Sequence, residues 1–162
     1  MKRRTFVGTC LLLPWVARAA DPEPLLRRPG ARDLCPVCGM VVAKYPNWVA
    51  SVTWKGGQVH FFDGAKDLFK YLFDLPRYAP GRRREEITGI TVTEYYDLRR
   101  IDARQAWFVI GSDVRGPMGH ELVPFASQAD AEEFLRDHGG RRILRFEEVK
   151  AGLPVRLDQG QF

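Results

Sequence analysis

The feature that most limits the fold of this chain is a short pattern that occurs twice. It consists of a strand-like apolar segment, a residue suited to cap a helix, and a helical spacing of apolar residues. The pattern centres on residues 61–63 and again on residues 125–127, 64 residues later. Strand-like segments also precede and follow each copy. We therefore predict an α+β fold in which two β-β-α-β units form one compact domain. Coincidence is the alternative, because a strand followed by a capped helix is common.

The first predicted unit rests on a glycine turn and a helix cap. Gly56 and Gly57 stand between two β-rich segments, and glycine tolerates the positive φ that tight turns need. Asp63 occupies the position expected of a helix N-cap, and Pro76 is expected to end the helix. The predicted elements are strands at 48–54, 58–62 and 87–95 and a helix at 65–75.

The second predicted unit repeats this order. Ser127 is expected to cap the helix, with Asp130 three residues later in a weak capping box, and Gly139 is expected to end it. Residues 111–119 are rich in Gly and Pro and predict a long loop. The predicted elements are strands at 106–110, 121–125 and 142–146 and a helix at 129–138.

The N-terminus has the pattern of an export signal over residues 1–19. Lys2, Arg3 and Arg4 precede an apolar stretch that is too short to span a bilayer, and residues 17–19 give a small-x-small cleavage pattern. Residues 3–7 also resemble a twin-arginine signal. We therefore expect an exported mature chain that begins at Ala20. The alternative is a cytoplasmic protein in which this segment is a buried strand.

Composition divides the rest of the chain. Residues 20–33 are rich in Pro and charge and predict a flexible leader. The globular domain is expected at 34–150, with its two units at 34–96 and 97–150, followed by a C-terminal tail at 151–162. Cys10 lies early in the signal and lacks a Leu-small-small-Cys pattern, which disfavours a lipid anchor.

The charge balance disfavours a nucleic-acid-binding protein. The whole chain has a formal net charge of +5, but the predicted signal peptide holds four cations and no acids, which leaves +1 for the mature chain. The remaining arginine clusters, at 82–84 and 141–142, are short and lack interleaved stacking aromatics. They are expected to be solvated surface or contacts with a partner.

The chemistry is expected where the sulfur-bearing residues lie. The mature chain holds two Cys, two Met and three His. Cys35, Cys38 and Met40 form one cluster, and Met118 and His120 form the other, both beside glycine in turn-like segments. Methionine usually fills gaps in a core, but neither of these lies on a predicted helix. Because thiolate and thioether are soft ligands that suit Cu(I), we predict that the two loops face each other and hold a Cu(I) ion in a partly exposed site.

Four other interpretations of Cys35 and Cys38 differ in what they require. Covalent haem needs His directly after the second Cys, where Gly39 stands. A structural zinc site would have to recruit two histidines to complete four ligands. A thioredoxin-like site would place the pair at the start of a helix, whereas residues 40–42 lead toward a strand. A stapling disulfide suits an exported chain and stays open, alone or alongside metal binding by the reduced pair.

The other titratable residues favour structural roles. His60 lies in an apolar strand and is expected to be a core histidine, and His138 lies at a helix C-terminus, where a positive charge is favourable. The sequence holds no Ser/His/Asp set, no isolated carboxylate pair and no phosphate-binding glycine loop. An enzyme is therefore disfavoured.

Three stretches carry a resemblance to a known family. The motif CPVCGM at 35–40, FFDG at 61–64 and WFVIGSDVRGPMG at 107–119 are similar to the NosL family, and the likeness extends over about residues 34–149. The resemblance implies a Cu(I) chaperone for the assembly of nitrous oxide reductase in the periplasm. It also implies a pair of β-β-α-β units similar to the organomercurial lyase core, in agreement with the repeat.

The resemblance further implies which residues bind copper and which partners receive it. By matching position, the family's copper ligands become Cys35, Cys38, Met40 and Met118, and we add His120 because it directly follows the second motif. The implied partners are apo-nitrous oxide reductase and its membrane assembly machinery. Family members are commonly lipoproteins, and this chain departs from them in lacking a convincing attachment cysteine.

Overall fold

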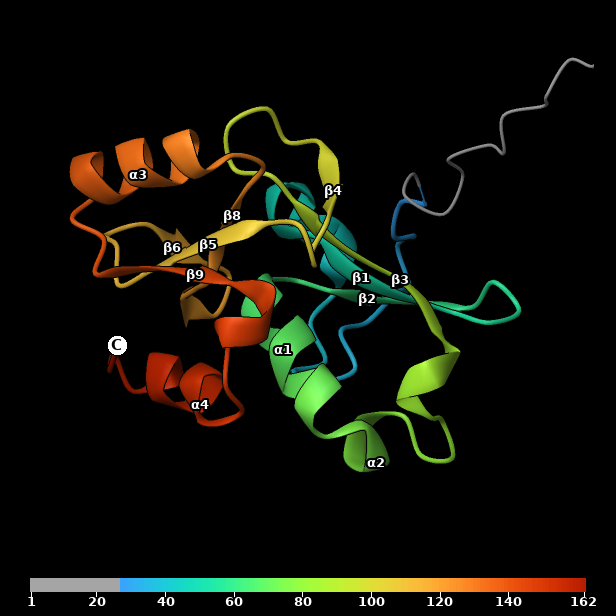
Figure 1. The fold of residues 1–162 in the computed structure, drawn as a ribbon. Helices are drawn as coiled ribbons and strands as arrows, with labels where there is room; N and C mark the ends of the chain where they lie inside the picture. The colour runs from blue at the N-terminus through green and yellow to red at the C-terminus, as the bar shows by residue number, and fades with distance from the viewer. Residues whose placement is uncertain (1–26) are drawn as a thin grey trace, which may run out of the picture.

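Residues 27–162 are the part of the chain that the computed structural model describes (Figure 1). The predicted signal peptide and residues 20–26 of the predicted leader lie outside the described residues. The described part combines helices with antiparallel β-sheets, which confirms the predicted α+β class. It contains no helix that is both long and apolar enough to cross a membrane.

The first β-β-α-β unit is built on a four-stranded antiparallel sheet in the order β2-β1-β3-β4. Its strands are β1 (Ala50–Trp54), β2 (Val59–Phe62), β3 (Ile87–Thr93) and β4 (Arg100–Asp102). The predicted glycine turn joins β1 to β2, with φ of 87° at Gly56 and 81° at Gly57. The edge strand β4 is missing from the sequence prediction because three residues are too few to show a strand period.

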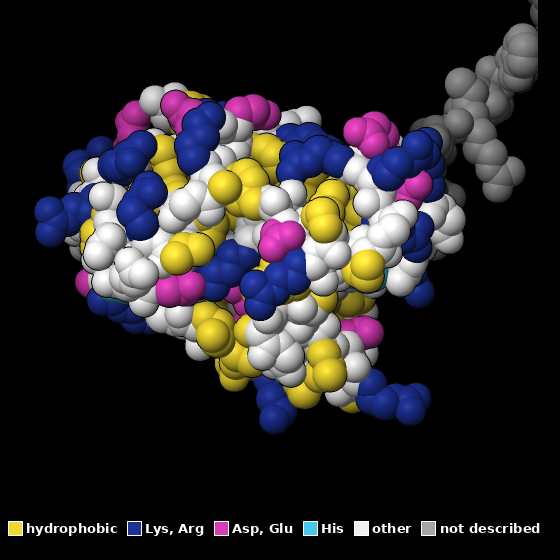
Figure 2. Space-filling view, turned by 90° about the horizontal axis from the view of Figure 1, so that it is seen from below, with side chains coloured by type: hydrophobic (Ala, Val, Ile, Leu, Met, Phe, Trp, Pro, Cys, Tyr) yellow, Lys and Arg dark blue, Asp and Glu magenta, His cyan; other side chains and the backbone are white. Residues whose placement is uncertain are grey.

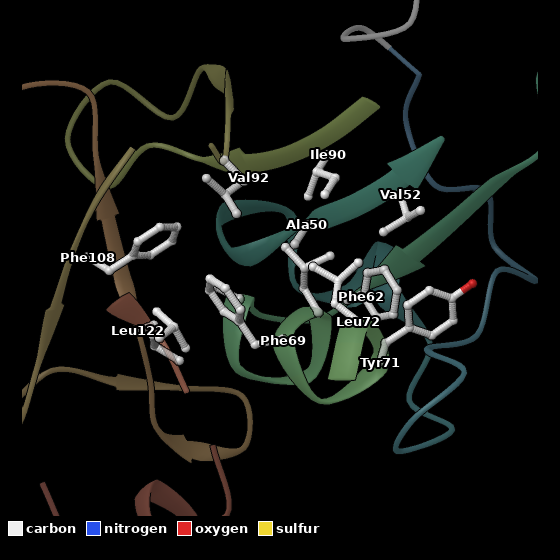
Figure 3. Packing of buried hydrophobic residues seen from close by; sticks show 14 of the residues in the cluster. Ala50, Val52, Phe62, Phe69, Tyr71, Leu72, Ile90, Val92, Phe108 and Leu122 are labelled. Atoms are coloured by element: carbon white, nitrogen blue, oxygen red, sulfur yellow. The ribbon is translucent and has the colours of Figure 1, made fainter. Parts of the chain in front are cut away.

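The two faces of this sheet differ in chemistry. Ala50 and Val52 point toward α1 (Ala65–Phe73) together with residues of β3, as Figure 3 shows. The alternate residues carry hydroxyls and face the other side, which follows from the two-residue period of a strand. This hydroxyl face consists of Ser51, Thr53, Thr91 and Thr93, all buried. The sheet is therefore covered on both sides.

The boundaries of the first helix differ from the prediction at both ends. Gly64, with extended backbone, is the N-cap and gives no side-chain cap, so the cap predicted for Asp63 is wrong; the Asp63 carboxylate bonds elsewhere. Pro76 does not end this helix, because α1 already ends at Phe73. Pro76 instead lies near the start of the short helix α2 (Leu75–Tyr78), where its fixed φ is compatible with helix.

The second β-β-α-β unit has the same connectivity as the first. Its antiparallel sheet has the order β8-β5-β9 and is followed through Ser127, whose hydroxyl oxygen accepts from the Asp130 amide and so caps the helix as predicted. Its elements are β5 (Trp107–Ile110), β8 (Val123–Phe125), α3 (Gln128–Asp137) and β9 (Arg142–Arg145). The prediction of two β-β-α-β units is confirmed.

Several short elements fill the connections. The loop predicted at 111–119 contains one strand of a small hairpin formed by β6 (Arg115–Gly116) and β7 (Gly119–His120). The described part also has four 3-10 helices, namely η2 (Val42–Lys44), η3 (Pro46–Trp48), η4 (Arg84–Glu86) and η5 (Phe146–Glu148). Met118, one of the predicted ligands, lies at the turn of this hairpin.

A shared core joins the two units. Phe69 of α1 lies between them, with its ring centroid 5.4 Å from that of Phe108 on β5 and 5.0 Å from that of Phe146. Phe108 and Leu122 approach Phe69 from the second unit, as Figure 3 shows. The other face of the second sheet packs on α3 through Val109, Val123 and Phe134. The α1 helix is thus the common element on which both sheets depend.

The segment predicted as a C-terminal tail contains the helix α4 (Gly152–Asp158). Leu153 and Leu157 are buried in the shared core, so this helix belongs to the fold. Asp158 at its end forms ion pairs with Lys66 (2.9 Å) and Lys70 (2.8 Å) of α1. The C-terminal segment therefore lies against the same helix that both sheets use.

The surface carries mixed charge. Figure 2 shows one face on which Lys and Arg side chains are scattered among acidic side chains and small hydrophobic groups. On this face there is no continuous basic stripe of the kind that follows a nucleic-acid backbone.

Candidate metal centre

A tight loop brings the two cysteines to one place. The backbone amide of Cys35 donates to the Met40 carbonyl at 2.9 Å, and that of Gly39 donates to the Cys35 carbonyl at 2.8 Å. Gly39 has a φ of 79°, which glycine adopts at little cost. A β-bridge between Leu34 and Val41 closes the base of the loop. The loop lies against the N-terminal end of α1.

Two aspartates complete a four-residue cluster with the cysteines. Cys35, Cys38, Asp63 and Asp67 each offer a ligand atom within 4.8 Å of the others. The Cys35 thiol donates to Asp67 Oδ2 at 3.5 Å, and the Cys38 thiol donates to Asp63 Oδ1 at 3.2 Å. Within the described residues it is the only group of three or more His, Cys, Asp or Glu side chains close enough to share an ion.

The burial of this cluster keeps the thiols protonated. Burial raises the pKa of the Cys35 thiol far above its usual range, and the charges of Asp63 and Asp67 raise it further. Burial likewise raises the pKa of Cys38 to about 12. A nucleophilic CxxC pair needs a lowered thiol pKa, so this environment disfavours a thioredoxin-like oxidoreductase. Both cysteines are free thiols in the structure, which therefore does not form the stapling disulfide that stood as an alternative interpretation.

The carboxylates leave room for a cation. Asp63 Oδ2 is buried and has no hydrogen-bond partner within the described part of the chain, which is a costly state for a carboxylate. Asp67 Oδ1 lies 3.2 Å from the Lys70 ammonium. Asp67 Oδ1 likewise makes no hydrogen bond within the described part beyond this ion pair, so two sulfur and two oxygen donors converge with unsatisfied carboxylate oxygens. A cation that replaced the thiol protons would give both the sulfur and the oxygen donors a partner.

The second sulfur-bearing loop reaches the same helix end through a buried lysine. Lys66 is fully buried, and its ammonium donates to the Met118 carbonyl at 2.6 Å while pairing with Asp158. Lys66 is the neighbour of Asp67, which bonds the Cys35 thiol. The β6–β7 turn and the cysteine loop therefore both attach to the first turn of α1.

The structure gathers only some of the predicted ligands into one cluster. Cys35 and Cys38 are brought together, and Met40 is partly buried in the same loop. Met118 is 41 % exposed at the tip of its turn. His120 packs its ring against Phe162 with centroids 4.7 Å apart and also contacts the guanidinium of Arg115, and it is not one of the clustered residues.

Sequence reasoning missed the roles of Asp63 and Asp67. The sequence predicts Asp63 as a helix cap and makes no prediction for Asp67, an acidic residue in the first turn of α1, where such residues are common. The available signal was the proximity of both acids to one helix start that follows a strand. What the sequence did not reveal is that a loop some 30 residues upstream folds onto this turn.

The true helix cap comes from the other unit. Glu121 is buried, and its Oε1 accepts from the Lys66 amide at 2.5 Å and from the Leu122 amide at 2.9 Å. Gly64 must lack a side chain, because a Cβ there would stand 2.2 Å from Glu121 Oε2. Glu121 thereby connects the second sheet to the start of α1, one residue before Asp67.

Replacing Glu121 by glutamine is expected to stabilise the protein increasingly as the pH rises from 5 to 8. Burial raises the pKa of Glu121 from 4.5 to about 8, so the folded state pays to ionise it. The stabilising contribution of protonated Glu121 to folding is fully present below about pH 4.5, the pKa in the unfolded chain. It is lost progressively as the pH rises toward and through about 8, the pKa in the folded protein. The gain should reach a few kcal/mol at pH 8, since one pKa unit corresponds to about 1.4 kcal/mol. Urea unfolding of both proteins at several pH values measures it, and a difference independent of pH would contradict it.

Comparison with known proteins agrees with this architecture. The NosL family model matches residues 28–153. The copper-binding lipoprotein NosL of Stutzerimonas stutzeri is 34 % identical over 122 residues, which cover 75 % of this chain and 64 % of that protein, slightly under two thirds of its length. The crystal structure of the copper chaperone NosL from Shewanella denitrificans matches with a TM-score of 0.65 and 29 % identity, over 80 % of this chain and 98 % of that one.

Proposed function

The chain belongs to the NosL family, and from this membership we propose that it is a copper chaperone, which binds Cu(I) through Cys35 and Cys38 and passes it to a recipient protein without catalysing a reaction. The observation that carries the proposal is the convergence of both thiols with two carboxylates at one end of α1. Thiolates are the protein ligands best suited to Cu(I). The relatives described as copper-binding and as a copper chaperone support the choice of metal.

The aspartates explain how buried thiols can release their protons. Binding of one Cu(I) by both cysteines forms two Cu–S bonds and breaks two S–H bonds. Asp67 and Asp63 already accept hydrogen bonds from these thiols, so each carboxylate is positioned to receive a proton as its thiol becomes a thiolate. The carboxylates thereby limit the build-up of negative charge around a univalent ion, and reversal of the same transfer favours release.

Partial exposure suits a protein that must give its ion away. Cys35 is 1 % exposed, whereas Cys38 is only partly buried and Met118 is 41 % exposed. Met40 and Met118 supply thioethers that need no deprotonation, and His120 supplies a nitrogen, as additional ligands in this proposal. A recipient's thiolates or imidazoles would replace the exposed ligands first and displace the Cys35 thiolate last.

The proposed recipient is apo-nitrous oxide reductase, reached through its membrane assembly machinery, and the proposed compartment is the periplasm. The family and the export-signal pattern at residues 1–19 support these assignments. Copper-loaded protein is expected to activate apo-nitrous oxide reductase in the presence of a chelator that removes free copper. Equal activation by Cu(I)-chelator alone would contradict a delivery role.

Zinc binding is the second candidate, favoured by the two carboxylates in the cluster. Two sulfur and two oxygen donors suit the four-coordinate geometry of Zn²⁺ better than that of Cu(I), which prefers fewer and softer ligands. Competition with Cu(I) and Zn²⁺ under reducing conditions separates the candidates. Asp63→Asn should weaken Zn²⁺ binding strongly if its carboxylate is a ligand, and Cu(I) binding moderately if it only accepts a proton.

Copper uptake is expected to depend steeply on pH. Because burial raises both thiol pKa values, the cysteines stay protonated across the neutral range and each thiolate ligand requires loss of one proton. The apparent Cu(I) affinity should then rise by about a hundred-fold per pH unit if both protons leave to solvent, and about ten-fold if one stays on an aspartate. Competition with a Cu(I) chelator between pH 6 and 8 measures this slope, using the reduced protein and about one equivalent of copper. A flat profile would show that both protons stay on the aspartates, whereas a flat profile that persists in the Asp63→Asn and Asp67→Asn double variant, which cannot accept them, would show that thiolates are not the ligands.

A further inference from the structure

A second candidate site lies on the hydroxyl side of the first sheet, away from the cysteine cluster. It is an open pocket of about 580 Å³ between the start of the described chain, η2 and η3, and the hairpin that joins β3 to β4. Four of its lining residues are arginines, namely Arg27, Arg28, Arg99 and Arg100, and among the described residues no Asp or Glu lines it. The pocket is therefore strongly positive.

Arg100 is the unusual member of this group. Its Nη2 donates to the hydroxyl oxygens of Ser51 (3.1 Å) and Thr91 (2.8 Å), which are neutral partners. Its Nε is buried and has no partner, and no ion pair of Arg100 occurs among residues 27–162. Desolvation lowers the pKa of Arg100 to about 10, so the guanidinium is still charged at neutral pH. A partly buried cation without a counter-charge among the described residues is an unfavourable arrangement that an anion would relieve.

The neighbouring arginines add to the positive charge of the pocket. Arg27 is exposed and donates only to the Gly57 carbonyl among the described contacts, and Arg28 is also exposed. Arg99 pairs with Asp97 at 2.9 Å, where both side chains are 58 % exposed and the pair is screened by water. Only part of the positive charge around the pocket is therefore neutralised by the protein.

The size and walls of the pocket indicate an anion attached to an organic body. A lone phosphate or carboxylate would fill only a small part of 580 Å³. Pro29, Val49 and Leu98 also line the pocket and supply apolar surface. Leu98 is 47 % exposed and has a φ of 58°, a strained conformation for leucine, and it also borders a hollow beside Tyr96.

We propose that this pocket binds the carboxylate of an acidic, partly apolar peptide segment of a partner protein, with the partly buried Arg100 as its anchor. Guanidinium and carboxylate form strong, directional hydrogen bonds, and Nη1 of Arg100 makes no hydrogen bond among the described residues, where only Nη2 donates. Leu98 packs against an apolar side chain next to the acidic one. The site is independent of the copper proposal, because it uses none of the proposed copper ligands.

The test uses the capped peptide acetyl-Glu-Leu-Glu-Leu-Glu-amide and its glutamine counterpart, with binding followed by amide NMR shifts. The glutamate peptide should shift the amides of Asn47, Thr93 and Leu98, and the glutamine peptide should bind at least about ten-fold more weakly. Arg100→Gln should also weaken the glutamate peptide at least about ten-fold. Arg136→Gln on α3 removes an equal charge outside the pocket and should leave binding unchanged.

A stability measurement separates binding from a structural role. Removal of a partly buried cation that has no ion pair among the described residues should leave the thermal midpoint of Arg100→Gln equal to or above that of the unaltered protein, while peptide binding is lost. Loss of both would assign Arg100 a structural role and overturn the proposal. Equal peptide binding by Arg100→Gln would also overturn it, as would inorganic phosphate or phosphatidylglycerol vesicles binding through Arg100 when the peptide does not. Peptide binding that appears only after Asp21→Asn and Glu23→Gln would show that the chain's own acids fill the pocket.

Discussion

Replacing both Cys35 and Cys38 by serine is expected to lower the affinity for Cu(I) by more than about a hundred-fold, since loss of an outer partner of a metal ligand alone costs about 10–100-fold. The serine hydroxyls keep the size of the side chains and can still donate to Asp67 and Asp63, which hold the thiols in the native protein. The soft donors are lost while the fold is retained. Competition with a Cu(I) chelator measures the affinity, and circular dichroism checks the fold.

Single variants resolve the contributions within the site. Met118→Ala should weaken Cu(I) binding less than Cys38→Ser does, because a neutral thioether contributes less to the affinity than a thiolate. Asp67→Asn should leave the ligands in place and alter mainly the pH at which copper binds. Unchanged uptake by the combined Met118→Ala and Cys38→Ser protein would show that copper binds elsewhere.

Replacing Phe69 by alanine is expected to reduce the free energy of unfolding by about 3–5 kcal/mol, the usual cost of removing a fully buried aromatic side chain. The Phe69 side chain is 1 % exposed and contacts aromatic rings from the second unit, Phe108 and Phe146. The resulting cavity would lie between the two sheets, and it could be filled only if one sheet moved relative to the other. Urea unfolding followed by fluorescence measures the loss.

Phe73→Ala is the matched control for this variant. Phe73 lies one helical turn further along α1 and stacks on Phe69 with centroids 6.2 Å apart, but it is 38 % exposed. Its loss should cost less than about 1.5 kcal/mol, because much of its surface is already in water. Equal costs for the two variants would contradict a core shared by both units, and two separate unfolding transitions would do so as well.

Local sequence patterns predicted most of the fold because the two units are regular. Turn glycines such as Gly56 and Gly57, the Ser127 cap and the alternating strands each act within a few residues, so their effects can be read from the chain. Edge strand β4 and helix α4 could not be predicted in this way. Both are short; β4 shows too few residues for a strand period although it pairs with the neighbouring strand β3, and α4 is stabilised by contacts with residues far away in sequence.

The candidate site was predicted in part, and the missing part is tertiary. Cys35 and Cys38 stand out because sulfur-bearing residues are scarce in the mature chain and lie in glycine-flanked turns. Asp63 and Asp67 have no such signal, since an acidic residue at a helix start is common for local reasons. Likewise nothing local indicates that Glu121 caps a helix of the other unit. These roles exist only once the loop and both units have packed together.

The ion pairs of Asp158 have a practical consequence for how the protein is handled. The Lys66 ammonium donates to the Met118 carbonyl and also pairs with Asp158. The end of α4 therefore helps to hold the turn that carries Met118. Removing or unfolding the end of the chain would leave that ammonium buried with only the Met118 carbonyl as partner, and the turn that carries Met118 would be held less firmly. Labels, tags and fusions attached beyond Phe162 would lie close to the β6–β7 hairpin, whose His120 ring contacts Phe162, and therefore need a spacer.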